Sequence, residues 1–238
     1  MIITRKELKE YLFTDGQLYP KMTNGFMKRL KNRIVTSPQS TQWNIYSYLR
    51  NLRYSEYHLN NSILRKSLSF VSVYHTVCLL FRYKTLRRLS FLTGFQIDPG
   101  SFGKGLMIYH YGSIVVNAGA KIGDYATIYP GVLIGAKENG CPTIGHHCFI
   151  GAGSKILGGV KIGNHVTIAP NAVVVKDVPD YAVVAGVPAK IIGYRYDEET
   201  IALLQKTHWW TMGEQWFDEH WDLMVDLEKY KKYFQKMK

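Results

Sequence analysis

Several short motifs that indicate a particular chemistry are absent from this sequence. It contains no G-x-x-x-x-G-K-[ST] phosphate-binding loop and no G-x-S-x-G nucleophile motif, which argues against a P-loop NTPase and an α/β-hydrolase. Cysteine is scarce, because Cys78, Cys141 and Cys148 are the only three, and their spacing fits no zinc site. Such a pattern is typical of reduced thiols, so we expect a cytoplasmic protein.

Neither a secretory leader nor a membrane-spanning run is expected from the sequence. Residues 1–10 carry Lys, Arg and Glu but no apolar stretch, so no signal peptide is expected. The longest apolar run lies between Lys66 and Arg82, includes Ser, Thr and His75, and is too short to cross a bilayer as a helix.

Acidic residues are scarce in the N-terminal region. Residues 1–98 hold 16 Lys and Arg against 5 Asp and Glu, so they carry nearly all of the formal net charge of +12. Nucleic acid, an anionic membrane face or an anionic substrate would each suit such an excess. A solvated helix surface is the simpler interpretation. We expect no nucleic acid partner and keep weak association with an anionic membrane face as a hypothesis.

The strongest positive signal is a repeat of six residues between positions 116 and 174. A period of six fits neither a helix nor an alternating strand and is typical of a parallel β-helix. Three such units form one triangular coil, with the apolar side chain pointing into the prism and contributing roughly 2 kcal/mol when buried. All ten repeat positions are Ile or Val: Val116, Ile122, Ile128, Ile134, Ile144, Ile150, Ile156, Ile162, Ile168 and Val174.

The repeat has one interruption, and helices are expected on both sides of it. Ten residues replace six between Ile134 and Ile144, so residues 136–143 are predicted to form a loop that leaves a corner of the prism. The predicted fold is mainly β, with a helical, basic N-terminal region (1–94), a β-helix (95–192) and a helical tail (193–238).

The helical regions carry local signals. Thr4-Arg5-Lys6-Glu7 is a capping box before a helix that ends near Phe13, while Asp15-Gly16 and Asn24-Gly25 are turn dipeptides. We expect the N-terminal helices to cover the open end of the β-helix, whose strand edges and apolar cross-section need a cap. Further helical patterns cover residues 41–59, 63–92, 196–204 and 216–234.

The hexads resemble those of the left-handed β-helix of hexapeptide-repeat acyltransferases, and the resemblance covers residues 95–192. Residues 95–98 and 105–116 resemble the active-site coil of serine acetyltransferases and, more closely, that of the related O-acetyltransferases of bacterial capsule and exopolysaccharide clusters. Residues 196–201 and Trp209-Trp210 are similar to the tail of xenobiotic acetyltransferases of the same fold. The resemblance implies a left-handed coil, acetyl-CoA as co-substrate, no metal, and a homotrimer with active sites between subunits.

The same resemblance assigns the site. It makes His110 the catalytic base, a common role of histidine. Asp98 matches an Asp that orients this His in serine acetyltransferases, although the stretch that joins the two is shorter in this chain. Tyr109 and Cys141 are the expected acceptor contacts. Cys141 stands where serine acetyltransferases carry a second active-site His, which favours an acceptor other than serine.

The expected cofactor site follows the prism. The resemblance gives Ala152, Pro170 and Val175 the role of holding the pantetheine arm. Lys176 and Lys190 would meet the phosphates of CoA as point charges.

These features predict a cytoplasmic O-acetyltransferase that acetylates a sugar hydroxyl of a bacterial surface polysaccharide by direct transfer. The alternatives are a small-molecule acetyltransferase acting on serine or a xenobiotic, and a non-catalytic β-helix scaffold. A zinc site would need His110, His146 and a third ligand near position 151, which is Gly, so no metal is expected. We interpret His146, His147 and His165 as structural or exposed.

Overall fold

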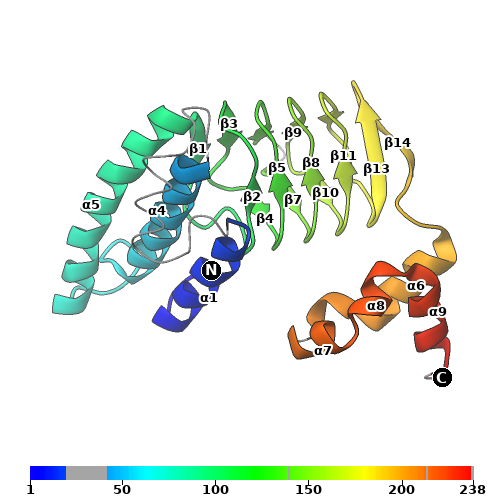
Figure 1. Ribbon diagram of the computed structural model, residues 1–238. Helices are drawn as coiled ribbons and strands as arrows, with labels where there is room; N and C mark the ends of the chain where they lie inside the picture. Colours follow the sequence, from blue (N-terminus) through cyan, green and yellow to red (C-terminus); the bar gives the residue numbers. More distant parts are fainter. Residues whose placement is uncertain (20–41, 139, 213, 237–238) are drawn as a thin grey trace. The chain divides into compact units, whose positions relative to one another are not determined.

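The structure is a computed structural model, and the residues described are 1–19, 42–138, 140–212 and 214–236. The chain divides into two compact units, Met1–Gly193 and Tyr194–Lys238. The first unit holds a parallel β-helix preceded by helices, and the second holds short helices (Figure 1). The predicted mainly β fold, with helices before and after the repeat, is confirmed.

Short strands form three sheets, which are the faces of a triangular prism. Neighbouring strands come from successive coils and run parallel, as where Ile150 lies between Ile128 and Ile168. Face A contains β1 (Phe95–Ile97), β3 (Ile114–Val116), β6 (Leu133–Gly135), β9 (Lys155–Leu157) and β12 (Val173–Val174). Face B contains β4 (Lys121–Ile122), β7 (Thr143–Ile144) and β10 (Lys161–Ile162). Face C contains β2 (Met107–Ile108), β5 (Thr127–Ile128), β8 (Phe149–Ile150), β11 (Thr167–Ile168), β13 (Ala182–Gly186) and β14 (Ala189–Tyr194).

The chain passes from face C to face A, then to face B and back to face C. Each coil therefore has three corners, which we name C/A, A/B and B/C. The corner loops of successive coils lie above one another, so residues at equivalent points of the repeat line up along the prism edges.

The core of the prism is the predicted column of Ile and Val. All ten repeat positions are buried, and even the most exposed of them, Ile122, is only 5% exposed. The interruption leaves the prism at the A/B corner, and Ile144 rejoins the column by pairing with Ile122. The predicted core and loop are both confirmed.

The B/C corner is occupied by a column of stacked rings. Tyr125, His147, His165 and Tyr181 have positive φ values of 56°, 55°, 56° and 59°. This left-handed conformation costs a non-glycine residue roughly 1–2 kcal/mol. The ring centroids lie 4.8, 4.8 and 4.7 Å apart along the column, so stacking offsets part of that cost. His147 and His165 are therefore structural, as predicted.

Two tyrosines close strand edges of the first coil. They reach the prism from the segment after α1 (Arg5–Gln17) and from α4 (Gln42–Asn61). The Tyr19 hydroxyl donates to the carbonyl of Ile108 at 3.0 Å and accepts from its N–H at 2.8 Å. The Tyr48 hydroxyl makes the same pair of bonds with Ile97, each at 3.2 Å. Each hydroxyl thus takes the place of the strand that a further coil would supply.

A buried ion pair closes the third edge. Arg53, which is 1% exposed, donates to Asp15 at 2.8 Å and to the carbonyl of Phe102 at 2.8 Å. Asp15 also accepts from the N–H groups of Gly105 and Leu106 at 2.8 and 3.2 Å. The helices therefore cap the open end of the prism, as predicted, through polar contacts as well as apolar packing.

Some local helix predictions need correction. The capping box of Thr4 and Glu7 is confirmed, and its backbone hydrogen bonds lower the pKa of Glu7. The predicted turn at Asp15-Gly16 is wrong, because α1 continues through it to deliver Asp15 to the prism. The turn predicted at Asn24-Gly25 lies outside the described residues. α5 (Phe70–Thr93) begins later than predicted, at a capping box formed by Ser69 and Ser72.

The second unit contains α6 (Glu198–Thr207), η1 (Trp209–Thr211), α7 (Glu214–Glu219), α8 (Trp221–Val225) and α9 (Leu227–Lys236). Asp197 caps α6 by accepting from the Thr200 N–H at 2.8 Å, which lowers the pKa of Asp197. The single helix predicted over 216–234 is wrong. Asp226 is extended, and its side chain accepts from the N–H groups of Glu228 and Lys229, so a new helix starts there.

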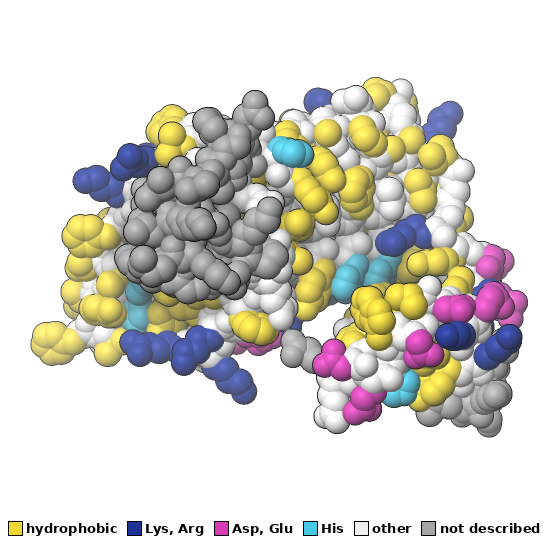
Figure 2. Space-filling model, viewed as in Figure 1, with side chains coloured by type: hydrophobic (Ala, Val, Ile, Leu, Met, Phe, Trp, Pro, Cys, Tyr) yellow, Lys and Arg dark blue, Asp and Glu magenta, His cyan; other side chains and the backbone are white. Residues whose placement is uncertain are grey.

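Charge is unevenly distributed over the molecular surface. Figure 2 shows Lys and Arg side chains over the N-terminal helices, whereas Asp and Glu are prominent on the C-terminal helices. Over the described part of the chain, none of the helices combines the length and apolar character needed to cross a membrane.

Candidate active site

His110 lies at the C/A corner, directly after β2. Its side chain is exposed, whereas Ile108, two residues earlier, is 1% exposed and belongs to the core. Ala152 and Pro170 follow β8 and β11 at the same corner of later coils. Consecutive corner loops are hydrogen-bonded, as where the Asn171 N–H donates to the carbonyl of Ala152 at 2.8 Å. The fold therefore places His110 and two predicted cofactor residues along one edge of the prism.

A strip of aromatic rings runs beside this edge on face C. Tyr109, which is 44% exposed, stacks on Tyr129 at 5.1 Å, and Tyr129 lies 5.3 Å from Phe149. The rings form an apolar surface next to His110. Sequence reasoning missed Tyr129 and Phe149. Tyr129 directly follows β5 and Phe149 begins β8, so the repeat already places both on face C.

A different set of predicted residues gathers at the A/B corner. The Cys141 Sγ lies 3.4 Å from Oδ1 of Asn117, which also accepts from the Gly119 N–H at 2.9 Å. A Cβ atom on Gly119 would lie only 2.4 Å from that sulfur, so glycine makes room for the cysteine. Val175 and Lys176 follow β12 at the same corner, and both are exposed.

Asp98 also lies at the A/B corner, because it follows β1 on face A. No hydrogen bond or ion pair joins Asp98 to His110 in the described residues. Its charge instead lies close enough to Tyr48 and Tyr83 to help raise the pKa of both phenols, after the larger effect of their burial. Lys190 is exposed on β14 of face C, at the far end of the prism.

His146 lies at the third corner, B/C, and so does not converge with His110 on one metal. Its Nδ1 accepts from the Asp124 N–H at 3.0 Å, which is a structural role. In residues 1–19, 42–138, 140–212 and 214–236, no cluster of three His, Cys, Asp or Glu side chains could hold a metal ion.

One chain therefore divides the predicted site residues between two prism edges. His110, Tyr109, Ala152 and Pro170 lie at or beside the C/A corner, whereas Asp98, Cys141, Val175 and Lys176 lie at the A/B corner. The C/A edge offers an exposed imidazole, a row of backbone groups and a flat aromatic surface. An imidazole in this position can remove a proton from a hydroxyl group.

Comparisons with known proteins agree with this fold. Residues 141–176 match the family of bacterial transferase hexapeptides (six repeats). The serine acetyltransferase of Staphylococcus epidermidis is 44% identical over 120 residues, which cover 47% of this chain and 56% of that protein. The chain thus spans about half the length of the curated relatives that it matches.

Solved structures give a similar result. The crystal structure of serine acetyltransferase from Brucella abortus is 28% identical, with a TM-score of 0.58 over 79% of this chain and 70% of that one. A structure of serine acetyltransferase from the same organism in complex with coenzyme A is 26% identical, with a TM-score of 0.58 over 80% of this chain and 69% of that one.

These findings confirm the predicted resemblance to hexapeptide-repeat acyltransferases. They also correct the predicted acceptor. The similar proteins are serine acetyltransferases, so a surface polysaccharide as acceptor is wrong and the alternative, a small hydroxyl compound, is better supported. The error came from giving Cys141, a single position, more weight than a similarity that extends over 120 residues.

Proposed function

We propose that this chain is an acetyl-CoA-dependent O-acetyltransferase whose acceptor is serine. The observation that carries the proposal is the 44% identity over 120 residues to a serine acetyltransferase. The coenzyme A complex of a similar enzyme supports acetyl-CoA as the donor. The exposed position of His110 on the C/A edge supports it as the base.

In the proposed reaction, His110 removes the proton of the serine hydroxyl as that oxygen attacks the thioester carbonyl of acetyl-CoA. A backbone N–H stabilises the negative charge that forms on the carbonyl oxygen. The bond between carbon and sulfur then breaks, and His110 returns the proton to the leaving thiolate. The products are O-acetylserine and CoA, and no metal takes part.

A homotrimer would unite the two sets of site residues. Within one prism, the C/A edge with His110 and the A/B edge with Cys141 and Lys176 are different corners. Packing the C/A edge of one copy against the A/B edge of another would bring them together, and three copies close such a ring. Light scattering is expected to give three times the chain mass of 27.3 kDa, whereas a monomeric active enzyme would contradict this arrangement.

The catalytic assignment is tested by replacing His110 with Ala. Loss of a general base is expected to lower kcat for L-serine by about 10²–10⁴-fold, while the affinity for CoA stays within about twofold. CoA thiol release from acetyl-CoA measures the rate, and calorimetry measures the affinity.

His146→Ala is the matched control, because this exposed histidine lies at another corner. It is expected to keep near-normal turnover. A His110→Ala enzyme with near-normal kcat would refute the role of the base. Turnover on another small hydroxyl compound, with none on L-serine, would refute the acceptor alone.

A further inference from the structure

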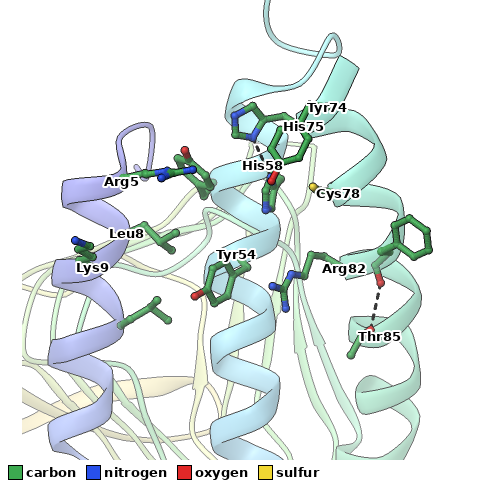
Figure 3. Close-up of a pocket in the computed structure, with 13 residues that line it drawn as sticks. Arg5, Leu8, Lys9, Tyr54, His58, Tyr74, His75, Cys78, Arg82 and Thr85 are labelled. Carbon is green, nitrogen blue, oxygen red and sulfur yellow. Dashed lines mark hydrogen bonds between the residues drawn. The ribbon is translucent and has the colours of Figure 1, made fainter. Parts of the chain in front are cut away.

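Three of the helices described in the N-terminal region form a pocket away from the prism edges. It lies between α1, α4 and α5 and has a volume of about 560 Å³ (Figure 3). Small-molecule sites commonly measure 300–1,000 Å³, so the space suits a compact ligand. We call it the helix pocket. It belongs entirely to the first unit and contains none of the residues assigned to acetyl transfer.

The ionisable groups of the helix pocket make it positive. Arg5 and Lys9 enter from α1 and Arg82 from α5, and none of its described lining residues is Asp or Glu. Arg82 is held in place, because it donates to Asn51 at 3.2 Å and lies 4.3 Å from the ring centre of Tyr54. Arg5 and Lys9 form no ion pair with any carboxylate of the described chain. Three cations therefore face one space without a matching anion.

Two histidines in the wall have pKa values lowered first by burial and then by the neighbouring charges. His58 and His75 are each 7% exposed, and their Nδ1 atoms lie 2.9 Å apart, so the N–H of one ring donates a hydrogen bond to the other. Burial and the charges of His75 and Arg82 lower the pKa of His58 to about 4. Burial, Lys66 and Arg5 lower the pKa of His75. The lowered pKa values favour the neutral form of both rings, so the positive charge of the pocket comes from Arg5, Lys9 and Arg82.

The remaining wall is apolar and aromatic. Leu8, Leu12 and Phe81 line it together with Tyr54 and Tyr57. Such a surface suits a ring or a short hydrocarbon attached to the charged group, because aromatic faces bind flat apolar groups at little entropic cost.

We propose that the helix pocket binds a small organic anion, whose phosphate or carboxylate group contacts Arg5, Lys9 and Arg82 and whose apolar part lies against the tyrosines. The site is separate from the proposed acetyl-transfer edge and does not depend on that function. Because α1 and α4 also carry Asp15 and Arg53, an occupied pocket holds together the helices that cap the prism.

Calorimetry on the full chain with phenyl phosphate tests the proposal. We expect saturable binding with one site per chain. Arg5→Gln and Arg82→Gln should each weaken it at least tenfold, because each removes a charge-assisted contact. Lys84→Gln is the matched control, since this basic residue of α5 does not line the pocket, and it should change the affinity less than twofold. Circular dichroism verifies that each variant is folded.

Further measurements test which part of the ligand is recognised and where on the protein it binds. Inorganic phosphate is expected to bind at least tenfold more weakly than phenyl phosphate, and equal affinity would overturn the organic part of the proposal. Lys190→Ala should leave phenyl phosphate binding intact, whereas loss of binding would place the anion on the prism. No saturable binding, or equal weakening by Lys84→Gln, would overturn the proposal as a whole.

The pH dependence provides an independent check. Arg5, Lys66 and Arg82 face the histidine pair together with Tyr57, Tyr74 and Cys78, and no Asp or Glu is among them. A bound anion would stabilise a protonated His58. Phenyl sulfate keeps a single negative charge over this range, so its affinity should rise as the pH falls from about 7.5 to about 5.5. An affinity that falls over this range would contradict the placement of the anion beside the histidines.

Discussion

The Tyr19 hydroxyl gives a direct test of how the helical cap supports the site. It makes two hydrogen bonds to the backbone of Ile108, at 3.0 and 2.8 Å, and the residue is only 2% exposed. Tyr19→Phe removes one oxygen and leaves a buried N–H and a buried carbonyl unpaired. Each unpaired group costs about 1–3 kcal/mol, so the free energy of unfolding should fall by about 2–6 kcal/mol.

Denaturation in guanidinium chloride, followed by circular dichroism, measures this loss. Tyr46→Phe is the matched control, because its ring lies 5.9 Å from that of Tyr19 and is also buried, but it closes no strand edge. The control should lose less than about 0.5 kcal/mol.

The same variant has a functional consequence. His110 follows Ile108 by two residues, so a loosened β2 should lower kcat several-fold. If Tyr19→Phe matches the wild type within about 0.5 kcal/mol and in kcat, the hydroxyl does not close the edge and the reasoning is refuted.

Two further predictions concern buried charge. Arg53→Met leaves Asp15 without its buried partner and should lower the free energy of unfolding by about 3–5 kcal/mol in a denaturant titration. Arg50→Met, at a half-buried position, should lower it by less than about 1 kcal/mol. Equal losses would contradict a special role for the ion pair. The folded-state pKa of His58, about 4, lies below its ordinary value of 6.5, so its contribution to stability is complete above pH 6.5 and declines as the pH falls towards 4. Unfolding titrations at pH 7 and pH 5 should show this decline, and it should be smaller in His58→Gln; an equal decline would assign it to other groups.

The repeat could be predicted from the sequence because its signal is local and periodic. Ile or Val recurs at a fixed interval along the sequence. Once the chain forms a coil, each of these residues stacks on the equivalent residue of the preceding coil, as Ile150 does on Ile128. The sequence predicted that helices cover the open end of the prism, but it did not predict which residues make the contacts. These contacts join residues 89, 49 and 38 positions apart, such as Tyr19 with Ile108, and no period marks such pairs.

The grouping of site residues could have been worked out from the repeat itself. Ala152 and Pro170 are one coil apart and must share a corner, whereas Cys141 falls in the loop that leaves the prism elsewhere. The acceptor was beyond this kind of reasoning, because Cys141 is a half-buried corner residue outside the core column of Ile and Val, which therefore does not fix its identity.

Because the coils are equally spaced, the length of a prism edge depends on the number of coils. Neighbouring strands in a sheet lie about 4.8 Å apart. One coil takes up the stretch from Ile150 to Ile168, which pair directly. An inserted coil would keep the column of Ile and Val intact and would move every later residue, including Lys190, one strand spacing further from His110. The distance between the proposed base and the far end of the edge can therefore change only in steps of about 4.8 Å, so the number of coils would set the length of the proposed donor that fits along it.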